Sequence, residues 1–473
     1  MRSGHSPKAE VTGSNPVGCA ILLAFVPFSR PAERLIDPGW LDSAGSGAMS
    51  VDLSFAQLRC PMPSLPQTAP VPHPGMGFRQ FVVLIALLMA VNALAIDAML
   101  PALPAIGDAL AVSTDNQRQW VVTAYLLGFG VSQLAYGPLS DRFGRKPVLL
   151  AGLGIFVAFS LAAALASSFV MLLAARVMQG VGSAATRVLS VSIVRDCYAG
   201  RQMARVMSLT FIVFLTIPIL APSIGQAILL VLPWPWIFGV LAVFGGSVAI
   251  WASLKLPETL HPEDRRPVSV SSILAAVRIT LTRRIAVGYM LAQAVAIGGL
   301  FGFITSAQQI FVDVFDEEAL FPALFALIAV FMGLSSYLNS RIVERLGTRF
   351  VSHSALIAYI AFASLHALVA WAGHETIVSF IALQSCMMFC FGLVGSNFGA
   401  MAMEPLGHVA GTASSVQGFV TTISGALIGF LIGQNFDGTV VPLTLGFALC
   451  GFAAMVIVLI TERGRLFRPA ALG

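Results

Sequence analysis

Long apolar segments alternate with short polar stretches along most of the sequence. From Arg79 onward, twelve apolar segments follow one another. A helix needs about 20 mostly apolar residues to cross the hydrocarbon core of a bilayer, and each segment reaches that length. We therefore predict twelve membrane-spanning helices, near residues 79–101, 118–138, 147–166, 169–192, 205–230, 236–255, 286–311, 320–342, 351–372, 376–401, 408–433 and 440–461.

The composition agrees with this pattern. Hydrophobic residues make up 57% of the 473 residues, charged residues make up 10%, and the mean hydropathy is +0.86. Soluble domains carry about 25% charged residues, so the sequence predicts an all-α polytopic membrane protein.

The distribution of charge predicts the orientation of the chain. Cations gather in alternate loops, around Arg142, Arg195, Arg341 and Arg463 and in the central linker. The opposite loops are acidic, and Arg118 is their only cation. Positively charged loops stay in the cytoplasm, so we expect both termini there. The net charge of +5 therefore indicates membrane anchoring and does not indicate a nucleic-acid partner.

The first 77 residues differ from the rest of the chain. They are rich in Pro, Ser and Gly, and their apolar run Cys19–Phe28 is too short to span a bilayer. We interpret residues 1–77 as a disordered extension, or as sequence upstream of a true start at Met49 or Met76. The remaining chain is divided into an N-terminal bundle (78–256), a cytoplasmic linker (257–284), a C-terminal bundle (285–462) and a cytoplasmic tail (463–473).

Two short patterns recur in the second half. The stretch "DRFGRK" from Asp141 has a counterpart in "ERLGTR" from Glu344, 203 residues later (344 − 141). The pair Gly225/Gln226 recurs at Gly433/Gln434, 208 residues later (433 − 225). These offsets predict a duplicated six-helix unit with a cavity between the two bundles at mid-membrane. For the second pair, a chance match of small residues in apolar sequence stays open.

The stretch "GPLSDRFGRKPVLL" lies between the second and third apolar segments. Gly144 suits a turn with positive φ, Gly137 a close helix approach, and Pro147 the first turn of the next helix. Asp141 is the only acid among three cations, and we expect it to bridge them to a neighbouring helix N-terminus. We predict a conformational-switch loop that contains Gly137, Asp141, Arg142, Gly144, Arg145 and Lys146.

This stretch resembles the signature loop G-x-L-x-D-R-x-G-R-K between helices 2 and 3 of the major facilitator superfamily. The segment "LLAARVMQGVGSAA" (172–185) is similar to the helix-4 motif R-x-x-Q-G-x-G of its proton-linked members. With "LPALP", "APSIG" and "LPETL", residues 79–260 resemble the Bcr/CflA drug-resistance branch. The resemblance implies the major facilitator fold and proton-driven export of drugs or small metabolites across a bacterial inner membrane.

The fifth apolar segment, "FIVFLTIPILAPSIGQAIL" (211–229), resembles the antiporter motif G-P-x-x-G-G of the same superfamily. It departs from that motif, because Ala221 and Gln226 stand where the first and last Gly would be. Pro218 and Pro222 each remove a backbone donor and Gly225 permits a close crossing, so we expect a kink in this helix.

Ionisable side chains inside the apolar segments are rare, and three of them predict proton and substrate coupling. Asp97 is the only carboxylate, and desolvation favours its neutral form, which suits a proton carrier. Arg176 and Arg187 share a helix face and need a wet cavity or an acid, for which Asp97 is the candidate. The alternatives are an interfacial Asp97 that ends helix 1 beside Pro101, and an Arg176 that contacts only backbone.

Polar residues within the apolar segments are candidates for the substrate cavity. They are Tyr125, Gln133, Gln179, Gln226, Gln293 and Asn397. Helix–helix hydrogen bonds are an equally good explanation for several of them.

The sequence contains no GK[ST] phosphate loop, no zinc-spaced His/Cys cluster and no lipase-type elbow. We therefore predict no enzyme activity, no metal and no cofactor. The expected energy source is the proton gradient, and the expected partners are a small-molecule substrate, protons and the lipid bilayer, with the chain acting as a monomer. Two alternatives stay open: export or symport of an endogenous metabolite or nutrient, and a non-transporting membrane sensor.

Overall fold

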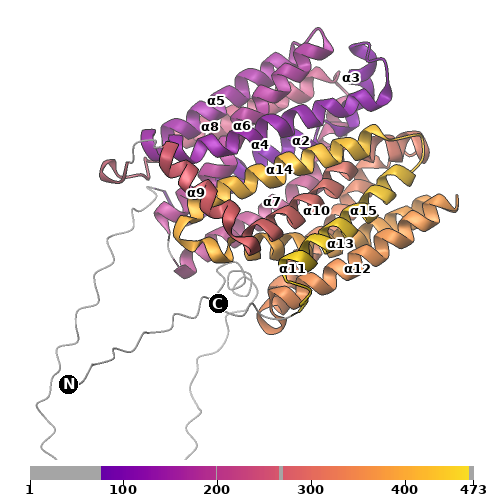
Figure 1. The fold of residues 1–473 in the computed structure, drawn as a ribbon. Helices are drawn as coiled ribbons and strands as arrows, with labels where there is room; N and C mark the ends of the chain where they lie inside the picture. Colours follow the sequence, from indigo (N-terminus) through magenta and orange to yellow (C-terminus); the bar gives the residue numbers. More distant parts are fainter. Residues whose placement is uncertain (1–75, 199, 266–269, 468–473) are drawn as a thin grey trace, which may run out of the picture.

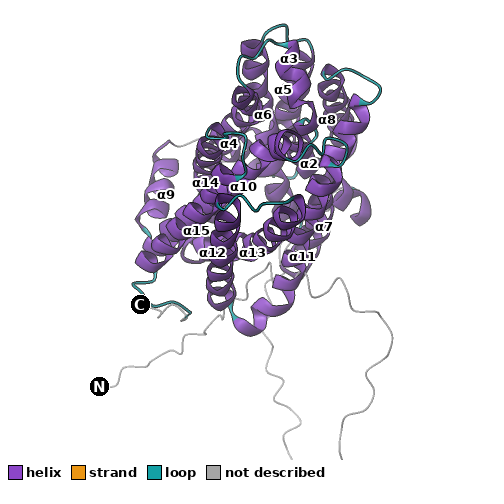
Figure 2. Ribbon diagram, turned by 90° about the vertical axis from the view of Figure 1, so that its right-hand side faces the viewer, coloured by secondary structure: helices purple, strands orange, loops and turns teal. Residues whose placement is uncertain are grey.

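A computed structural model of the chain describes residues 76–198, 200–265 and 270–467. These ranges are helical and contain no strand. The predicted N-terminal extension lies outside them, apart from Met76 and Gly77. Figure 1 shows long helices side by side, with the N-terminal helices in indigo to magenta and the C-terminal helices in orange to yellow. Figure 2 views the same arrangement after a quarter turn.

The first half of the described chain contains six long helices. Its elements are α2 (Phe78–Asp97), η1 (Leu100–Ala102), α3 (Leu103–Ala109), η2 (Asp115–Gln119), α4 (Trp120–Phe143), α5 (Arg145–Ala164), α6 (Phe169–Cys197), α7 (Gly200–Leu229) and α8 (Pro235–Lys255).

The second half repeats this pattern after a linker. Its elements are η3 (Pro262–Asp264), α9 (Val270–Thr282), α10 (Arg284–Gln309), η4 (Ile310–Val314), α11 (Phe321–Leu346), α12 (Thr348–Trp371), α13 (Ile377–Met403), η5 (Glu404–Val409), α14 (Ala410–Gln434) and α15 (Val441–Thr461).

Each predicted segment corresponds to one long helix, and ten of these helices within the described ranges are long and apolar enough to cross a membrane. The other two are α4 and α7. The fold class is therefore confirmed as an all-α bundle of membrane-spanning length, whereas the count of twelve spans stays a prediction.

Two local expectations were wrong. Helix α2 ends at Asp97, earlier than predicted, and the chain continues as η1 and α3, because Pro101 and Pro104 cannot donate helical hydrogen bonds. Most of the predicted switch loop is helical, since α4 continues to Phe143 and α5 begins at Arg145. The polar linker also contains a helix, α9.

The predicted duplication is visible in the turns and in the packing. Gly144 ends α4 with φ +100°, and Gly347 ends α11 with φ +81°, again 203 residues later (347 − 144). A Cβ on Gly225 of α7 would collide with the Ala98 carbonyl oxygen. A Cβ on Gly433 of α14 would collide with Gln119 Oε1 of the other half and would lie 3.0 Å from Thr305 Oγ1 of α10. Gly225 thus lies where α7 meets the end of α2, and Gly433 lies where α14 meets both α10 and Gln119.

Two glycines set the distance between α4 and α6. A Cβ on Gly180 of α6 would collide with the Tyr125 carbonyl oxygen of α4, and a Cβ on Gly128 of α4 would collide with the Val177 carbonyl oxygen of α6. The two backbones therefore touch, and only glycine fits at both positions.

We expect Gly180→Val to lower the free energy of unfolding by roughly 3 kcal/mol or to prevent folding, because overpacking forces the helices apart. The matched control is Gly154→Val on α5, where nothing lies within 4 Å of the added Cβ. Thermal unfolding in detergent, followed by size-exclusion chromatography, measures the difference. Equal melting temperatures for the two variants would contradict the close α4–α6 contact.

Candidate functional site

Arg176 lies completely buried on α6 and joins three helices. Its Nε donates to the Val121 carbonyl of α4 at 3.0 Å, and its Nη2 donates to the Ala95 carbonyl of α2 at 3.1 Å. Its Nη1 donates to Gln179 Oε1 at 2.5 Å, and its guanidinium carbon lies 4.5 Å from the ring centre of Tyr125. Three acceptors and an aromatic face therefore surround the buried charge.

The network around Arg176 extends to two residues that sequence reasoning missed. Tyr125 Oη is hydrogen-bonded to Asn92 Oδ1 at 2.9 Å and to Ser183 Oγ at 2.6 Å. Gln179 Nε2 donates to Ser160 Oγ at 2.7 Å. Asn92 was recognisable as a polar residue inside an apolar segment, five residues before Asp97. Ser160 carried no such signal, because serine is common in membrane helices.

Asp97 is buried at the end of α2, with 5% of its surface exposed. Its Oδ1 has no hydrogen-bond partner among the described residues. We expected Asp97 to serve Arg176 directly or through water. A direct ion pair is absent among the described residues, because Arg176 is satisfied by the two carbonyls and Gln179. The alternative of an arginine held by backbone is therefore the better description of Arg176 in this conformation.

Arg187 lies on the same face of α6 as Arg176 but is not hydrogen-bonded to this network within the described chain. Its side chain is exposed although it lies in the middle of α6. Only Arg176 is therefore part of the buried network, and the role of Arg187 in coupling stays a prediction.

Most of the predicted cavity residues are occupied in helix packing. Gln133 donates to Thr422 Oγ1 of α14 at 3.1 Å, and Asn397 donates to Asn339 Oδ1 of α11 at 2.8 Å. Tyr125, Gln179, Gln133 and Asn397 are all at most 2% exposed. Burial corrects their assignment to a cavity wall in this conformation.

Gln293 and Gln226 are half-buried, and their assignment to the cavity stays a prediction. Gln293 donates to the Gly395 carbonyl at 3.1 Å and accepts from Gln417 Nε2 at 2.8 Å. The described residues contain no group of three His, Cys, Asp or Glu that suits a metal ion.

A buried charge cluster surrounds the turn at Gly144. Arg145 is 4% exposed and pairs with Asp141 at 2.5 Å and with Asp196, at the end of α6, at 2.9 Å. Glu258 accepts from the backbone N–H groups of Arg145 at 2.8 Å and Lys146 at 3.2 Å. We had expected Asp141 to lie at a helix N-terminus. The acid at the N-terminus of α5 is instead Glu258. The motif "LPETL" contained this residue but gave no indication of its contact.

The C-terminal half has an equivalent cluster. Arg349 at the start of α12 is 8% exposed and pairs with Glu462 at 2.9 Å and Glu404 at 3.4 Å. Glu404 follows Asp196 by 208 residues (404 − 196), and Glu462 follows Glu258 by 204 (462 − 258). In each half, a buried arginine after the second long helix thus meets acids from the ends of the fourth and sixth.

At the opposite end of the helices, four amide side chains join the two halves. We call this group the amide clasp; it consists of Asn116 and Gln119 in the first half and Gln309 and Gln434 in the second. Gln119 Nε2 donates to Gln309 Oε1 at 2.5 Å, and Gln309 Nε2 donates to Asn116 Oδ1 at 2.9 Å. Gln434 Nε2 donates to the Asn116 carbonyl at 2.6 Å.

Backbone carbonyls of the second half complete the clasp. Asn116 Nδ2 donates to the carbonyls of Gln434 and Phe436 at 3.1 and 2.9 Å, and Gln119 Nε2 also donates to Gly433 at 3.0 Å. Gln119 and Gln309 are nearly completely buried. The clasp therefore excludes solvent at this end of the molecule.

Helices α4 and α14 stay in contact below the clasp. The rings of Trp120 and Phe430 are 4.2 Å apart, and a Cβ on Gly137 would lie 3.4 Å from Ser415 Oγ. Any passage between the halves along this seam therefore requires α4 and α14 to separate.

Comparison with known proteins agrees with this architecture. Residues 85–429 match the family model of the Major Facilitator Superfamily. The chain belongs to this family. It is accordingly a multi-pass membrane protein of a family whose members transport small molecules.

Individual relatives are similar over most of their length. The chain is 32% identical to "Uncharacterized MFS-type transporter YdgK" of Bacillus subtilis, over 76% of this chain and 90% of the relative. It is 30% identical to "Bicyclomycin resistance protein homolog" of Haemophilus influenzae (78% and 93%) and 28% identical to "Multidrug resistance protein D" of Escherichia coli K12 (74% and 87%). The crystal structure of a D-xylose–proton symporter matches the fold with a TM-score of 0.65 at 12% identity, covering 80% of this chain and 97% of that one.

We expect Gln119→Leu to weaken the amide clasp, because it leaves the buried Oε1 atom of Gln309 without a donor, at about 1–3 kcal/mol. A reporter cysteine at Thr305, introduced in a cysteine-free background, should then react about tenfold faster with a membrane-impermeant maleimide. The control is Ser113→Ala, whose hydroxyl contacts only Gln117 nearby. Equal labelling rates in Gln119→Leu and the parent would show that the clasp does not hold this end closed.

Proposed function

We propose that this transporter is a proton-coupled antiporter that exports drugs or other small amphipathic molecules. The relatives named for bicyclomycin resistance and multidrug resistance support export of toxic compounds, because their similarity covers nearly the whole of each relative. The cations of alternate loops support a bacterial inner-membrane location with both termini in the cytoplasm.

The observation that carries proton coupling is the unpartnered Oδ1 atom of Asp97. A buried carboxylate oxygen without a hydrogen-bond partner is unfavourable as part of an anion, so Asp97 holds a proton while α2 is packed as in this structure. Water that reaches the end of α2 allows the proton to leave. Asp97 thus binds a proton in one conformation and releases it in another.

The neighbouring backbone links Asp97 to the antiporter helix. Ala98 follows Asp97 directly, and its carbonyl lies against Gly225 of α7. Helix α7 also carries Pro218 and Pro222. A shift of α2 on proton release therefore displaces α7, and a substrate that moves α7 changes the environment of Asp97. Proton and substrate are coupled through this contact.

Arg187, the charge cluster around Gly144 and the amide clasp complete the proposed cycle. Arg187 is exposed in the middle of α6, so its charge is available to attract polar or anionic parts of a substrate. The charge cluster around Gly144 holds the ends of α4, α5 and α6 together while the halves move as rigid bodies. The amide clasp closes the opposite end. The proton gradient supplies the energy, and a monomer is sufficient for this cycle.

A second candidate is transport of an endogenous metabolite or nutrient, by export or by proton symport. The departure of Ala221 and Gln226 from the antiporter motif favours it. The direction of proton movement on substrate addition distinguishes antiport from symport.

We expect Asp97→Asn to abolish proton-coupled transport while the protein still folds, because asparagine has a similar shape but cannot exchange a proton. Inverted membrane vesicles with an imposed proton gradient are the appropriate system. A pH-sensitive dye in the lumen should report proton efflux when lipophilic cations or neutral antibiotics are added to vesicles with the wild-type protein.

The control is Asp264→Asn, which removes an exposed acid in the linker. It should retain wild-type proton efflux, and Asp97→Asn should show none. Compound-dependent proton efflux that persists in Asp97→Asn would refute the assignment of Asp97, and proton uptake on substrate addition would favour symport.

A further inference from the structure

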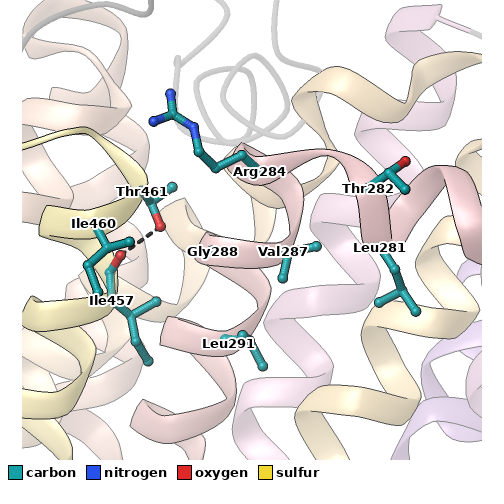
Figure 3. Close-up of a pocket in the computed structure, with 9 residues that line it drawn as sticks. All are labelled: Leu281, Thr282, Arg284, Val287, Gly288, Leu291, Ile457, Ile460 and Thr461. Carbon is teal, nitrogen blue, oxygen red and sulfur yellow. Dashed lines mark hydrogen bonds between the residues drawn. The ribbon is translucent and has the colours of Figure 1, made fainter.

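An apolar groove lies on the outside of the C-terminal half, where α9, α10 and α15 meet (Figure 3). Its volume is about 340 Å³. Leu281 of α9, Val287 and Leu291 of α10, and Ile457 and Ile460 of α15 line it. The side chains of Leu281, Leu291 and Ile460 are exposed, so the groove opens to the surface and not toward the other half.

Helices α10 and α15 pack closely at the end of the groove. A Cβ on Gly288 would collide with the Thr461 hydroxyl oxygen, so this glycine makes room for the Thr461 side chain. Thr461 Oγ1 donates to the Ile457 carbonyl at 2.6 Å, which leaves no free polar group on this part of the floor. Leu281 of α9 covers one edge of the groove.

Helix α9 carries an apolar stripe that faces outward. Leu274 and Leu281 are 60% and 51% exposed, and Arg278 lies between them at helical spacing. On its other side, Ile279 packs against Ala286, Leu406 and Ala413. Exposed leucines beside a cation suit a helix at the membrane interface, where the leucines contact acyl chains and the arginine reaches the headgroups.

The charges around the groove are positive. Arg283 and Arg284 are exposed at the junction of α9 and α10, and Figure 3 shows the Arg284 side chain extending from the rim beyond Val287. Glu462, which directly follows α15, is engaged by Arg349 and by the Tyr289 hydroxyl and does not neutralise the rim. An apolar floor below a cationic rim is complementary to an acyl chain attached to an anionic headgroup.

We propose that this groove binds a phospholipid with an anionic headgroup, one acyl chain lying between α10 and α15 and the phosphate contacting Arg283 and Arg284. The bound lipid would fill the gap between α9 and α15. Because α9 also packs against α14, which lies along α4 of the other half, the lipid would steady the linker that joins the two halves.

Native mass spectrometry of the full chain with equal amounts of phosphatidylglycerol and phosphatidylethanolamine tests this site. The wild-type protein should retain phosphatidylglycerol preferentially. Replacing both Arg283→Gln and Arg284→Gln should lower its retention about tenfold. Val287→Phe, which fills the groove, should lower retention similarly while both cations remain.

The matched control is Arg345→Gln, which removes an exposed cation at the end of α11, away from the groove. It should retain the lipid as the wild-type protein does. Equal retention of the two lipids by the wild-type protein, or unchanged phosphatidylglycerol retention in the double arginine variant, would overturn the proposal. Loss in the arginine variant without loss in Val287→Phe would overturn the placement of the acyl chain.

Discussion

The N-terminal half depends on one requirement, which is that the buried charge of Arg176 be satisfied without water. A guanidinium in a membrane bundle is stable only where acceptors surround it. The backbone carbonyls of Ala95 and Val121 supply two acceptors, and Gln179 supplies the third. Because two of these acceptors are carbonyls on other helices, they fix how α2, α4 and α6 meet. Gly128 and Gly180 serve the same requirement, since the α4 backbone can approach Arg176 only if α4 and α6 touch.

Polar interactions within a half differ in kind from those between the halves. Within each half, a buried arginine meets acids from two other helix ends, and breaking a buried pair of this kind costs about 3–5 kcal/mol. Between the halves, the amide clasp is made of neutral hydrogen bonds, each with a net contribution of about 0.5–1.5 kcal/mol. Leaving one clasp group unpaired costs about 1–3 kcal/mol, which is less than breaking one buried ion pair within a half. This difference favours movement of the halves as rigid bodies.

Elements with a strong local signal were predictable from the sequence. Hydrophobic length placed each long helix, and Gly144 and Gly347 marked turns that only glycine adopts easily. The partners of polar side chains were not predictable, because they depend on helix rotation and on contacts between distant segments. The opposite charges of Asp97 and Arg176 suggested an ion pair. Arg176 instead donates to backbone carbonyl groups, whose position no sequence pattern reveals. Gln133 and Asn397 suggested a cavity by polarity, but helix rotation directs them into interfaces. The contacts of Glu258 and of the amide clasp were not predicted for the same reason.

The unpaired Oδ1 atom of Asp97 differs from the other buried charged groups. Arg176, Arg145 and Arg349 are each surrounded by partners, whereas the Asp97 Oδ1 atom, equally inaccessible to water, has none in the described chain. A buried polar atom without a partner carries a desolvation cost, which a proton on the carboxyl group reduces. Ala98, the next residue, lies against Gly225 of α7, so this desolvation cost arises where the end of α2 meets α7. An acid that merely ended a helix at the membrane surface would have water as its partner. The Oδ1 atom of Asp97 lacks that partner, which supports the proposed proton exchange.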